Sequence, residues 1–369
     1  MPTTIVVDGK TETFGDTSGA LNGLAVAAGQ DLSQGARPDL AVGDANALLG
    51  RSVGGDDTVA GTLVSVGDAF TLGQHARGGD DAVILTASFS SVIGYGDAEV
   101  MRNWAVGGDD TVTGSGDVHS DLHMFGDART MSGHAVGGDD LLIGPVVASY
   151  TALYGDAQTL SDQVQAGDDT LSGPSLSSLP GRPGADLYGD GAAISGNVRC
   201  GNDSLSAVSN SAIVRMYGDG QTLGDAVTCG NDTLSGAPAF PVAGSGVTTT
   251  LYGDGESLLG RARGGDDLLI SRSGDDILWG DAAVVGVHAT AGADRFVFSP
   301  TNGHDHIMDF QPGKDRIELD GFGFAGFQDL ATHFQAAADG VLISFDANDD
   351  ILVRSVTPGQ LTAADFVFA

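Results

Sequence analysis

The sequence is poor in cysteine, in aromatic residues and in positive charge, and each shortage argues against a class of protein. Two cysteines in 369 residues cannot form a disulfide framework. Aromatic residues make up 6% of the chain, which is too few for a large conventional core. Lys and Arg number 16 against 49 Asp and Glu, and the formal charge of −33 argues against nucleic acid and anionic membranes as partners.

Long apolar runs and familiar catalytic motifs are also missing. No run of 18 apolar residues occurs, so we predict no transmembrane helix. The start, "MPTTIVVDGKTETFGD", lacks the basic and apolar regions of a cleavable signal peptide. Neither H-E-x-x-H nor a lipase-type nucleophile elbow is present, and no segment outside the repeats and the tail is large enough for an enzyme domain. We therefore predict that the chain is not an enzyme.

Glycine is abundant instead, with 58 residues, and much of it lies in two repeated motifs. The first motif, Gly-Asp before a small residue, begins at Gly43, Gly67, Gly96, Gly126, Gly155, Gly189, Gly218, Gly253 and Gly280. The second, Gly-acid-Asp or a close variant, begins at Gly55, Gly79, Gly108, Gly138, Gly167, Gly201, Gly230, Gly265 and Gly292. The second motif always follows the first after 12 residues, whereas the distance to the next first motif varies from 12 to 23. Each unit thus has a fixed half and a half that tolerates insertions; a degenerate unit begins at Phe14.

The residues around these motifs predict strands. An aromatic column precedes the first motif: Tyr95, Phe125, Tyr154, Tyr188, Tyr217, Tyr252 and Trp279. Thr-Val, Thr-Leu or Leu-Leu pairs follow the second motif, and Gly-Asp turns separate these short alternating segments. We therefore predict an all-β fold, a parallel β-solenoid with wide β-roll-like coils of about 29 residues, in which like residues stack about 4.8 Å apart.

The aspartates of the motifs predict calcium sites. One predicted column holds Asp57, Asp81, Asp110, Asp140, Asp169, Asp203, Asp232, Asp267, Asp276 and Asp294. Carboxylates stacked this closely repel one another unless a cation lies between them, and Ca²⁺ accepts 6–8 oxygen ligands. The first-motif aspartates are predicted as second contributors: Asp97, Asp127, Asp156, Asp190, Asp219 and Asp254. We expect several Ca²⁺ ions, and folding that depends on them.

A resemblance to a known family supports this interpretation. The stretch "SRSGDDILWGDA" (Ser271–Ala282) resembles the calcium-binding nonapeptide G-G-x-G-x-D-x-U-x of the RTX (hemolysin-type repeat) family. In the longer units, "YGDA" resembles the first half of that nonapeptide and "GGDDTL" its second half, with nine residues inserted between them. The resemblance covers nearly the whole chain, from residue 14 to residue 369.

The C-terminal part also resembles the closing segment of RTX proteins. Gly292–Phe322 holds three G-x-D matches, at Asp294, Asp305 and Asp315, and the last two join the predicted ligands. "FQDLATHFQAAADG" has helical spacing, and a hairpin is predicted to turn at Asn348-Asp349. We divide the chain into an N-terminal strand (1–13), the solenoid (14–290) and a C-terminal β-rich cap with one short helix and a secretion signal (291–369). The resemblance implies type I export from a Gram-negative bacterium to the outside or the cell surface, with the secretion apparatus as a partner.

Several residues allow a second interpretation. "HSDLH" (His119–His123) has the histidine spacing of a zincin helix, but Ser120 replaces the catalytic glutamate, so we interpret it as loop and strand. His304, Asp305 and His306 are interpreted as exposed residues around a G-x-D aspartate rather than as a transition-metal site. Cys200 and Cys229 share a column, so they are either small buried residues or within disulfide reach.

Three classes of function remain open. The first is a self-associating structural protein of a surface layer, matrix or fibre, for which Thr3–Val7 offers a strand that can pair with a neighbouring molecule. The second is an adhesin or a carbohydrate-binding protein that uses the aromatic column or the insertions to bind a cell-surface glycan; the same column is more often a stabilising ladder. The third is an enzyme of unrecognised type. A threonine column (Thr58, Thr111, Thr170 and Thr233) also resembles ice-binding faces, but Ala82 and Leu141 interrupt it.

Overall fold

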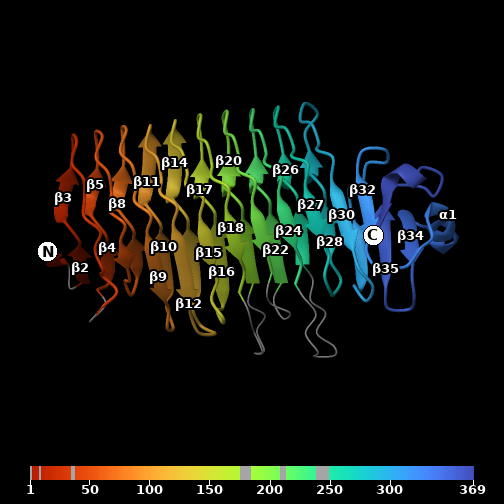
Figure 1. Ribbon diagram of the computed structural model, residues 1–369, viewed down its shortest axis with the longest axis horizontal. Helices are drawn as coiled ribbons and strands as arrows, with labels where there is room; N and C mark the ends of the chain where they lie inside the picture. Colours follow the sequence, from red (N-terminus) through yellow and green to blue (C-terminus); the bar gives the residue numbers. More distant parts are fainter. Residues whose placement is uncertain (1, 8–9, 35–37, 175–183, 208–212, 238–248) are drawn as a thin grey trace.

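The repeated units form coils that stack along the long axis of the molecule (Figure 1). The computed structural model describes residues 2–7, 10–34, 38–174, 184–207, 213–237 and 249–369. Each complete coil contributes one strand to each of three sheets, and coil follows coil in parallel register. The predicted all-β parallel solenoid is therefore confirmed.

The first sheet has 15 strands and runs the full length of the molecule. Its strands, in spatial order, are β1 (Thr3–Val7), β2 (Lys10–Phe14), β4 (Leu40–Val42), β7 (Val64–Val66), β10 (Ser91–Tyr95), β13 (Asp121–Phe125), β16 (Tyr150–Tyr154), β19 (Gly184–Tyr188), β22 (Ile213–Tyr217), β25 (Thr249–Tyr252), β28 (Ile277–Trp279), β31 (His304–Ile307), β35 (Asp350–Arg354), β34 (Gly340–Ser344) and β33 (Phe334–Ala337).

The second sheet has 10 strands, all parallel to their neighbours. They are β3 (Thr17–Leu21), β5 (Ala45–Leu48), β8 (Ala69–Leu72), β11 (Ala98–Asn103), β14 (Ala128–Gly133), β17 (Ala157–Leu160), β20 (Gly191–Ile194), β23 (Gly220–Leu223), β26 (Gly255–Leu258) and β29 (Ala282–Val285).

The third sheet has 11 strands and closes each coil. They are β6 (Thr58–Val59), β9 (Ala82–Thr86), β12 (Thr111–Ser115), β15 (Leu141–Ile143), β18 (Thr170–Ser172), β21 (Ser204–Ser206), β24 (Thr233–Ser235), β27 (Leu268–Ile270), β30 (Arg295–Phe298), β32 (Arg316–Leu319) and β36 (Phe366–Phe368). The threonine column lies here and is interrupted by Ala82 and Leu141, as the sequence shows.

Two apolar cores fill the coils. The inward residues of the first and third sheets, such as Leu122 and Leu142, form a core that continues to the C-terminal end. The second sheet buries small and medium side chains, such as Ala98 and Met101, against the turns that follow it. Successive side chains along each short strand point alternately into the core and toward the surface.

The aromatic column forms a ladder beside the first sheet. Successive rings stack with centroids 4.7 Å apart for Phe125 and Tyr154, 4.8 Å for Tyr154 and Tyr188, and 5.0 Å for Tyr188 and Tyr217. These four side chains are at most 6% exposed. Because each ring covers the face of its neighbour, the column acts as the stabilising ladder and does not offer ring faces to a sugar.

The sheets continue from the repeats into the C-terminal region. β31 pairs with β28 and then with β35, and β32 pairs with β30 and then with β36. The hairpin β34–β35 turns at Asn348-Asp349, as predicted. The predicted helix is shorter than its pattern: α1 spans only Phe327–Leu330, the short 3₁₀ turn η1 covers Ala331–His333, and β33 follows. Antiparallel pairing of β33 with β34 outweighs local helical spacing there.

The N-terminal end is covered only in part. β1 forms the predicted strand and folds back on β2 as an antiparallel hairpin, so it extends the first sheet alone. A second 3₁₀ turn, η2 (Ala363–Asp365), precedes the last strand at the other end. No helix in the described ranges has the length and apolar character needed to cross a membrane.

We predict that the aromatic ladder contributes strongly to stability. Tyr188→Ala removes a ring stacked on both sides and leaves a cavity, so the free energy of unfolding should fall by about 3 kcal/mol. Tyr188→Phe keeps the ring, as Phe125 does in its own coil, and should cost less than about 1.5 kcal/mol. Denaturant unfolding at saturating calcium measures both; equal losses for the two variants would contradict a role for stacking.

Candidate metal centre

The first-motif aspartates form a buried column at the turn between the first and second sheets, here named column I. Its members are Asp44, Asp68, Asp97, Asp127, Asp156, Asp190, Asp219, Asp254 and Asp281, each at most 1% exposed. One carboxylate oxygen of each accepts the backbone N–H of the second-motif glycine 11 residues later; the distance is 2.8 Å from Gly201 N to Asp190 Oδ1 and 3.1 Å from Gly138 N to Asp127 Oδ1. This bond explains why the spacing between the two motifs is fixed.

The second-motif aspartates form a parallel column before the third sheet, here named column II. The backbone N–H of each member except the last, Asp315, donates to Oδ1 of the aspartate one coil further on: from Asp81 to Asp110 over 2.6 Å, and from Asp110 to Asp140 over 2.7 Å. The members of column II are Asp57, Asp81, Asp110, Asp140, Asp169, Asp203, Asp232, Asp267, Asp294 and Asp315.

The first-motif glycines make this close approach possible. A Cβ atom on Gly96 would lie 2.0 Å from Asp110 Oδ2 and 1.8 Å from Gly126 O. The equivalent Cβ on Gly155 would lie 2.1 Å from Asp169 Oδ2. Only glycine leaves room for the column II carboxylate at this point.

Most carboxylates in the two columns retain one oxygen without a hydrogen-bond partner in the described part of the chain. In column I these oxygens belong to Asp44, Asp68, Asp127, Asp156, Asp190, Asp219 and Asp254. In column II they belong to Asp57, Asp81, Asp110, Asp140, Asp169, Asp203, Asp232, Asp267 and Asp294. Buried charged oxygens without partners are costly, so these atoms point to a ligand that is not part of the chain.

Glutamine side chains donate to the last carboxylate of column I and to Asp16, the carboxylate that precedes its first member. Gln30 Nε2 lies 3.3 Å from Oδ1 of Asp16, the aspartate of the degenerate first unit. Gln311 Nε2 donates to Asp281 Oδ2 over 2.9 Å. The carboxylates between these ends have no such amide donor, so the residues fit a cation along the interior of the column.

The pKa values of the column carboxyls show the cost of this arrangement. Burial raises the pKa of Asp127 to about 6. Burial, together with the neighbouring Asp281 carboxylate, raises the pKa of Asp254 to about 8. Burial and Asp281 likewise raise the pKa of Asp294 to about 9. Burial raises the pKa of Asp140 well above its usual range, with further contributions from Asp127 and Asp169. All-oxygen donors at these positions suit Ca²⁺.

One residue that the sequence analysis placed in the predicted aspartate column, Asp276, lies elsewhere in the structure. Asp276 lies outside column II, because Asp267 bonds directly to Asp294 across 27 residues, one full coil. Asp276 is nine residues after Asp267 and faces a different side of the coil, where its N–H donates to Asp305 Oδ1 over 2.9 Å. Asp315 does join column II, but its second oxygen accepts the Gln311 N–H over 2.7 Å.

Asp276 and Asp305 belong to a separate hydrogen-bond network, in which uncharged side chains donate to the carboxylates. The Ser271 hydroxyl lies 2.9 Å from Asp276 Oδ2 and 3.1 Å from Asp305 Oδ2. Asn302 Nδ2 donates to Asp305 Oδ2 over 2.9 Å. Side-chain donors satisfy these carboxylates, so the nonapeptide-like stretch Ser271–Ala282 differs from columns I and II, in which most carboxylates keep a free oxygen.

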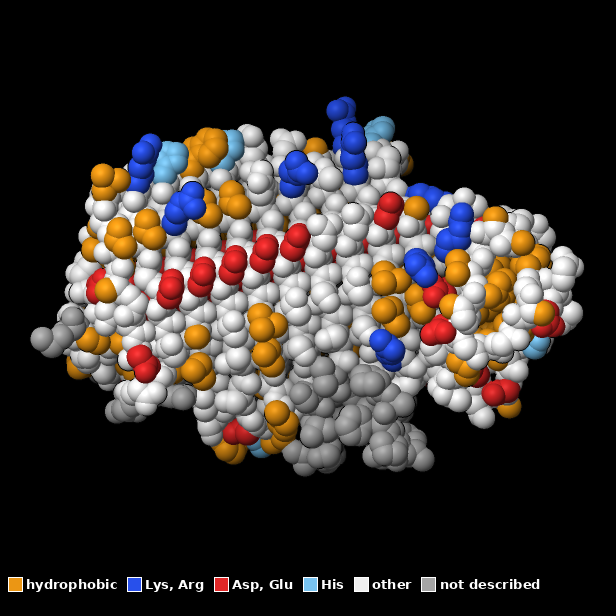
Figure 2. Space-filling view, in the orientation of Figure 1, with side chains coloured by type: hydrophobic (Ala, Val, Ile, Leu, Met, Phe, Trp, Pro, Cys, Tyr) orange, Lys and Arg blue, Asp and Glu red, His pale blue; other side chains and the backbone are white. Residues whose placement is uncertain are grey.

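Sequence reasoning missed two kinds of residue. Asp44 and Asp68 were not among the predicted ligands, although Gly43 and Gly67 begin the same motif, and their free oxygens place them in column I. The middle residue of the second motif forms an exposed row, in which the Asp109 N–H donates to Asp80 Oδ1 over 3.1 Å. Figure 2 shows such a line of acidic side chains along one face. The row comprises Asp56, Asp80, Asp109, Asp139, Asp168, Asn202, Asn231 and Asp266.

The histidine motifs form no metal site. His119 lies in an exposed turn and His123 in β13, so the zincin spacing is not on a helix. His304 Nδ1 lies 2.8 Å from Asp350 Oδ2, and this hydrogen bond raises the pKa of His304. Asp305 is buried between two histidines that are not, as alternation along β31 requires.

Comparison with known protein families finds one that matches the C-terminal third of the chain. Residues 244–368 match the family described as the C-terminal region of serralysins, Peptidase M10. This part of the chain is an RTX-type repeat region. RTX repeats bind Ca²⁺ as a family, and a serralysin C-terminal region is typical of proteins that type I systems export from Gram-negative bacteria.

Other comparisons are weaker than this RTX match. The extracellular lipase LipA from Serratia marcescens is similar at 16% identity over 78% of this chain, with a TM-score of 0.24. The chain spans 40% of the length of that lipase. No curated protein matches the chain significantly.

The raised pKa values predict that protons can replace calcium in the columns. Since the folded pKa values exceed the value of 3.8 for an ordinary aspartate, the folded state binds more protons than the unfolded chain. Stability without metal should therefore rise as pH falls, and should be lost as pH rises through about 6 (Asp127) to about 9 (Asp294). Circular dichroism in chelator should show β structure at pH 5 that disappears at pH 9.

The calcium-loaded protein is the control for this experiment, because its carboxylates are already neutralised. It should keep its β spectrum across the same range of pH. A metal-free protein that loses structure on acidification would contradict the assignment.

Proposed function

We propose that the chain is a secreted, calcium-binding RTX-type protein that folds when Ca²⁺ occupies columns I and II. The free carboxylate oxygens of the two columns are the observation that supports this proposal. The proposed ligands of column I are Asp44, Asp68, Asp127, Asp156, Asp190, Asp219 and Asp254. Asp97 is a further member of the column, and both of its carboxylate oxygens approach the Gly108 N–H. Column II supplies ligands through the oxygens that its backbone ladder leaves free.

Electrostatic repulsion links the ions to folding. Two carboxylates 4 Å apart repel by about 4 kcal/mol at an effective dielectric constant of about 20. Repeated along two columns, this exceeds the roughly 5–15 kcal/mol by which a domain is stable. Ca²⁺ reverses the sign of the interaction, so ion binding and folding should occur together.

The same linkage suits export through a channel. Extracellular calcium modules have dissociation constants of about 10⁻⁴–10⁻³ M, far above the calcium level of a cytosol. A chain with such sites stays unfolded before export, passes a narrow type I channel, and folds outside the cell. The serralysin-type C-terminal region supports this route.

We further propose a structural, self-assembling role and assign no catalysis to residues 1–369. The second sheet ends in an unpaired strand on each side of the described solenoid, β3 at the N-terminal end and β29 at the other. The hairpins at the C-terminal end extend only the first sheet, and β36 ends the third. Unpaired edges recruit further strands, and β29 can pair with β3 of another copy, which is a head-to-tail contact that builds a fibre.

Exposed apolar side chains mark both ends of this sheet. Val284, Val285 and Val287 are 51%, 44% and 94% exposed beside β29. Leu24 and Val26 are 80% and 74% exposed beyond β3. Apolar surface on both partners would be buried by head-to-tail pairing.

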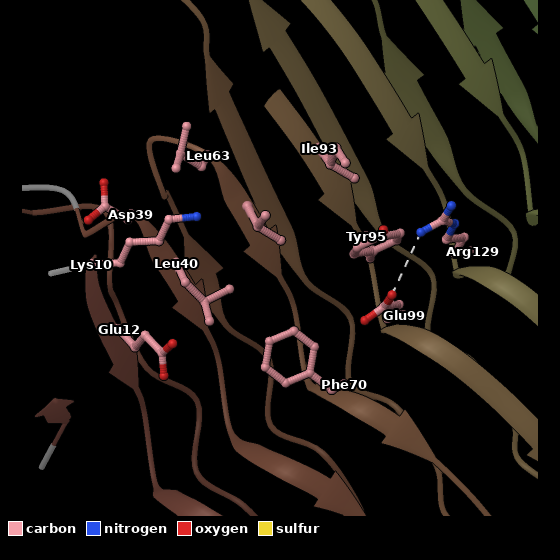
Figure 3. A pocket seen from close by; sticks show the side chains of 11 residues that line it. Lys10, Glu12, Asp39, Leu40, Leu63, Phe70, Ile93, Tyr95, Glu99 and Arg129 are labelled. Carbon is pink, nitrogen blue, oxygen red and sulfur yellow. Dashed lines mark ion pairs between the residues drawn. The ribbon is translucent and has the colours of Figure 1, made fainter. Parts of the chain in front are cut away.

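A glycan-binding role is the second candidate. A groove of about 290 Å³ lies at the N-terminal end of the first sheet, lined by apolar side chains such as Phe70 and the edge of Tyr95. Figure 3 shows charged groups around it, among them Lys10 and the ion pair of Arg129 with Glu99. Residues 175–183, 208–212 and 238–248 of the variable halves lie outside the described residues. A glycan-binding screen tests this role separately from assembly.

Neighbouring aspartates provide a matched pair for testing the calcium sites. Asp140→Asn removes a column II charge, so the calcium concentration at half-folding should rise roughly tenfold, equivalent to about 1.4 kcal/mol. The same change should stabilise the metal-free protein, because it removes a repelling buried carboxylate. Asp139→Asn changes the adjacent exposed row, where Asn202 and Asn231 occur naturally, and should alter neither quantity. Calcium titrations followed by circular dichroism measure both, and similar effects of the two variants would contradict the assignment.

The open edge can be tested in the same way. Val284→Lys places a charge on β29 and should abolish self-association at millimolar calcium, since edge lysines prevent strand addition. Val146→Lys makes the same change at a site that is 58% exposed in the middle of the solenoid and should leave association intact. Light scattering and electron microscopy give the outcome, and a wild-type protein that stays monomeric at high concentration excludes the structural role.

A further inference from the structure

The two cysteines interrupt a column of small residues that borders column I. The residue before the second motif is Gly54, Gly78, Gly107, Gly137, Ala166, Cys200, Cys229, Gly264 and Ala291 in successive coils. The backbone is the same throughout: the N–H donates to a carbonyl of the next coil, over 2.9 Å from Cys200 to Thr228 and over 2.8 Å from Gly78 to Val106. The cysteines therefore change only what occupies the space beside the carboxylates.

That space lies between successive members of column I. A Cβ on Gly107 would lie 1.8 Å from Asp127 Oδ1 and 2.5 Å from Asp97 Oδ2, so in the glycine coils the carboxylates themselves fill it. In the two cysteine coils the thiols fill it. The Sγ atom of Cys200 and carboxylate oxygens of Asp190 and Asp219 all lie within 4.8 Å of one another.

The second thiol repeats this arrangement one coil on. The Sγ atom of Cys229 and carboxylate oxygens of Asp219 and Asp254 also lie within 4.8 Å of one another. Asp219 is common to both groups, so two sulfurs and three carboxylates form one continuous cluster. Both cysteines are free, and each thiol lies near two carboxylates, of which Asp219 is shared.

Unsatisfied oxygens in the cluster point to a ligand. Oδ2 of Asp190, Asp219 and Asp254 has no hydrogen-bond partner within the described ranges, and all three side chains are fully buried. Their Oδ1 atoms are already used, by the N–H groups of Gly201 (2.8 Å) and of Gly230 and Gly265 (2.7 Å each). Each carboxylate of the groups that hold the sulfurs thus retains one oxygen that no backbone N–H satisfies.

We propose that a thiophilic divalent cation such as Zn²⁺ or Cd²⁺ binds in one of the two thiol–carboxylate groups, Asp190–Cys200–Asp219 or Asp219–Cys229–Asp254, and that the shared Asp219 limits the cluster to one ion. Sulfur is a poor ligand for Ca²⁺, which takes oxygen, whereas Zn²⁺ and Cd²⁺ accept thiolate together with carboxylate in a four-coordinate site. Two thiols alone would make a poor zinc site, and the buried carboxylates supply the missing ligands. This site shares Asp190, Asp219 and Asp254 with the column I ligands of the proposed function, and in these two coils the thiophilic cation takes the place of Ca²⁺.

Cadmium titration of the full-length protein tests the proposal. The protein is reduced with a phosphine, saturated with Ca²⁺ and titrated with Cd²⁺ alone. We expect one equivalent to bind, with the ultraviolet charge-transfer band of Cd–thiolate bonds, and excess Ca²⁺ should not displace it. The double variant Cys200→Ala/Cys229→Ala should lose both the band and the equivalent while still folding, because Ala166 and Ala291 occupy the same column.

A second pair of variants separates a mixed site from two thiols acting alone. Asp219→Asn should weaken Cd²⁺ binding by at least about tenfold. Asp127→Asn makes the same change in a glycine coil, where it weakens a proposed calcium site but should leave the Cd²⁺ affinity unchanged. Unchanged Cd²⁺ affinity in Asp219→Asn would overturn the proposal. So would displacement by Ca²⁺, or thiol counts showing that both cysteines react as freely with Cd²⁺ present as without it.

Discussion

Repulsion between buried carboxylates, stacked at the spacing of the coils, is the constraint on which the rest of this solenoid depends. Two columns of aspartates run side by side, and the backbone supplies each carboxylate with little more than one N–H. The glycines follow from this constraint, because a Cβ on Gly96 would occupy the place of the Asp110 carboxylate. The fixed motif spacing follows as well, since the aspartate of column I must reach an N–H 11 residues later.

The opposite side of each coil is held by different forces. The leucine-rich core between the first and third sheets and the ring ladder from Tyr95 to Trp279 need no ion. The two longest inter-motif segments of the sequence lie between β18 and β19 and between β24 and β25, in the half of the unit that joins the third sheet to the first. The chain thus tolerates length changes where only apolar packing sets the register, and forbids them where carboxylates must meet N–H groups.

Repetition in the sequence was sufficient to predict the parallel solenoid, the two aspartate columns and the hairpin at Asn348-Asp349, because period and turn chemistry are local properties. It failed where one coil contains two similar motifs. Asp276 matches the family nonapeptide better than Asp267 does, yet the length of a coil puts Asp267 in column II. The short helix α1 failed for a related reason, since pairing of β33 with β34 is decided by residues distant in sequence.

The number of donors around a carboxylate, rather than its motif, separates metal-binding from structural aspartates in this fold. Asp305 has a G-x-D motif, but Ser271 and Asn302 donate to its second oxygen. Asp140 has the same local sequence pattern and no donor for its second oxygen in the described structure. Those donors come from residues that precede the aspartate by irregular distances, so no fixed spacing encodes them. A cation is needed only where the coil provides one donor for two oxygens, and both columns end where a second donor appears, at Gln311.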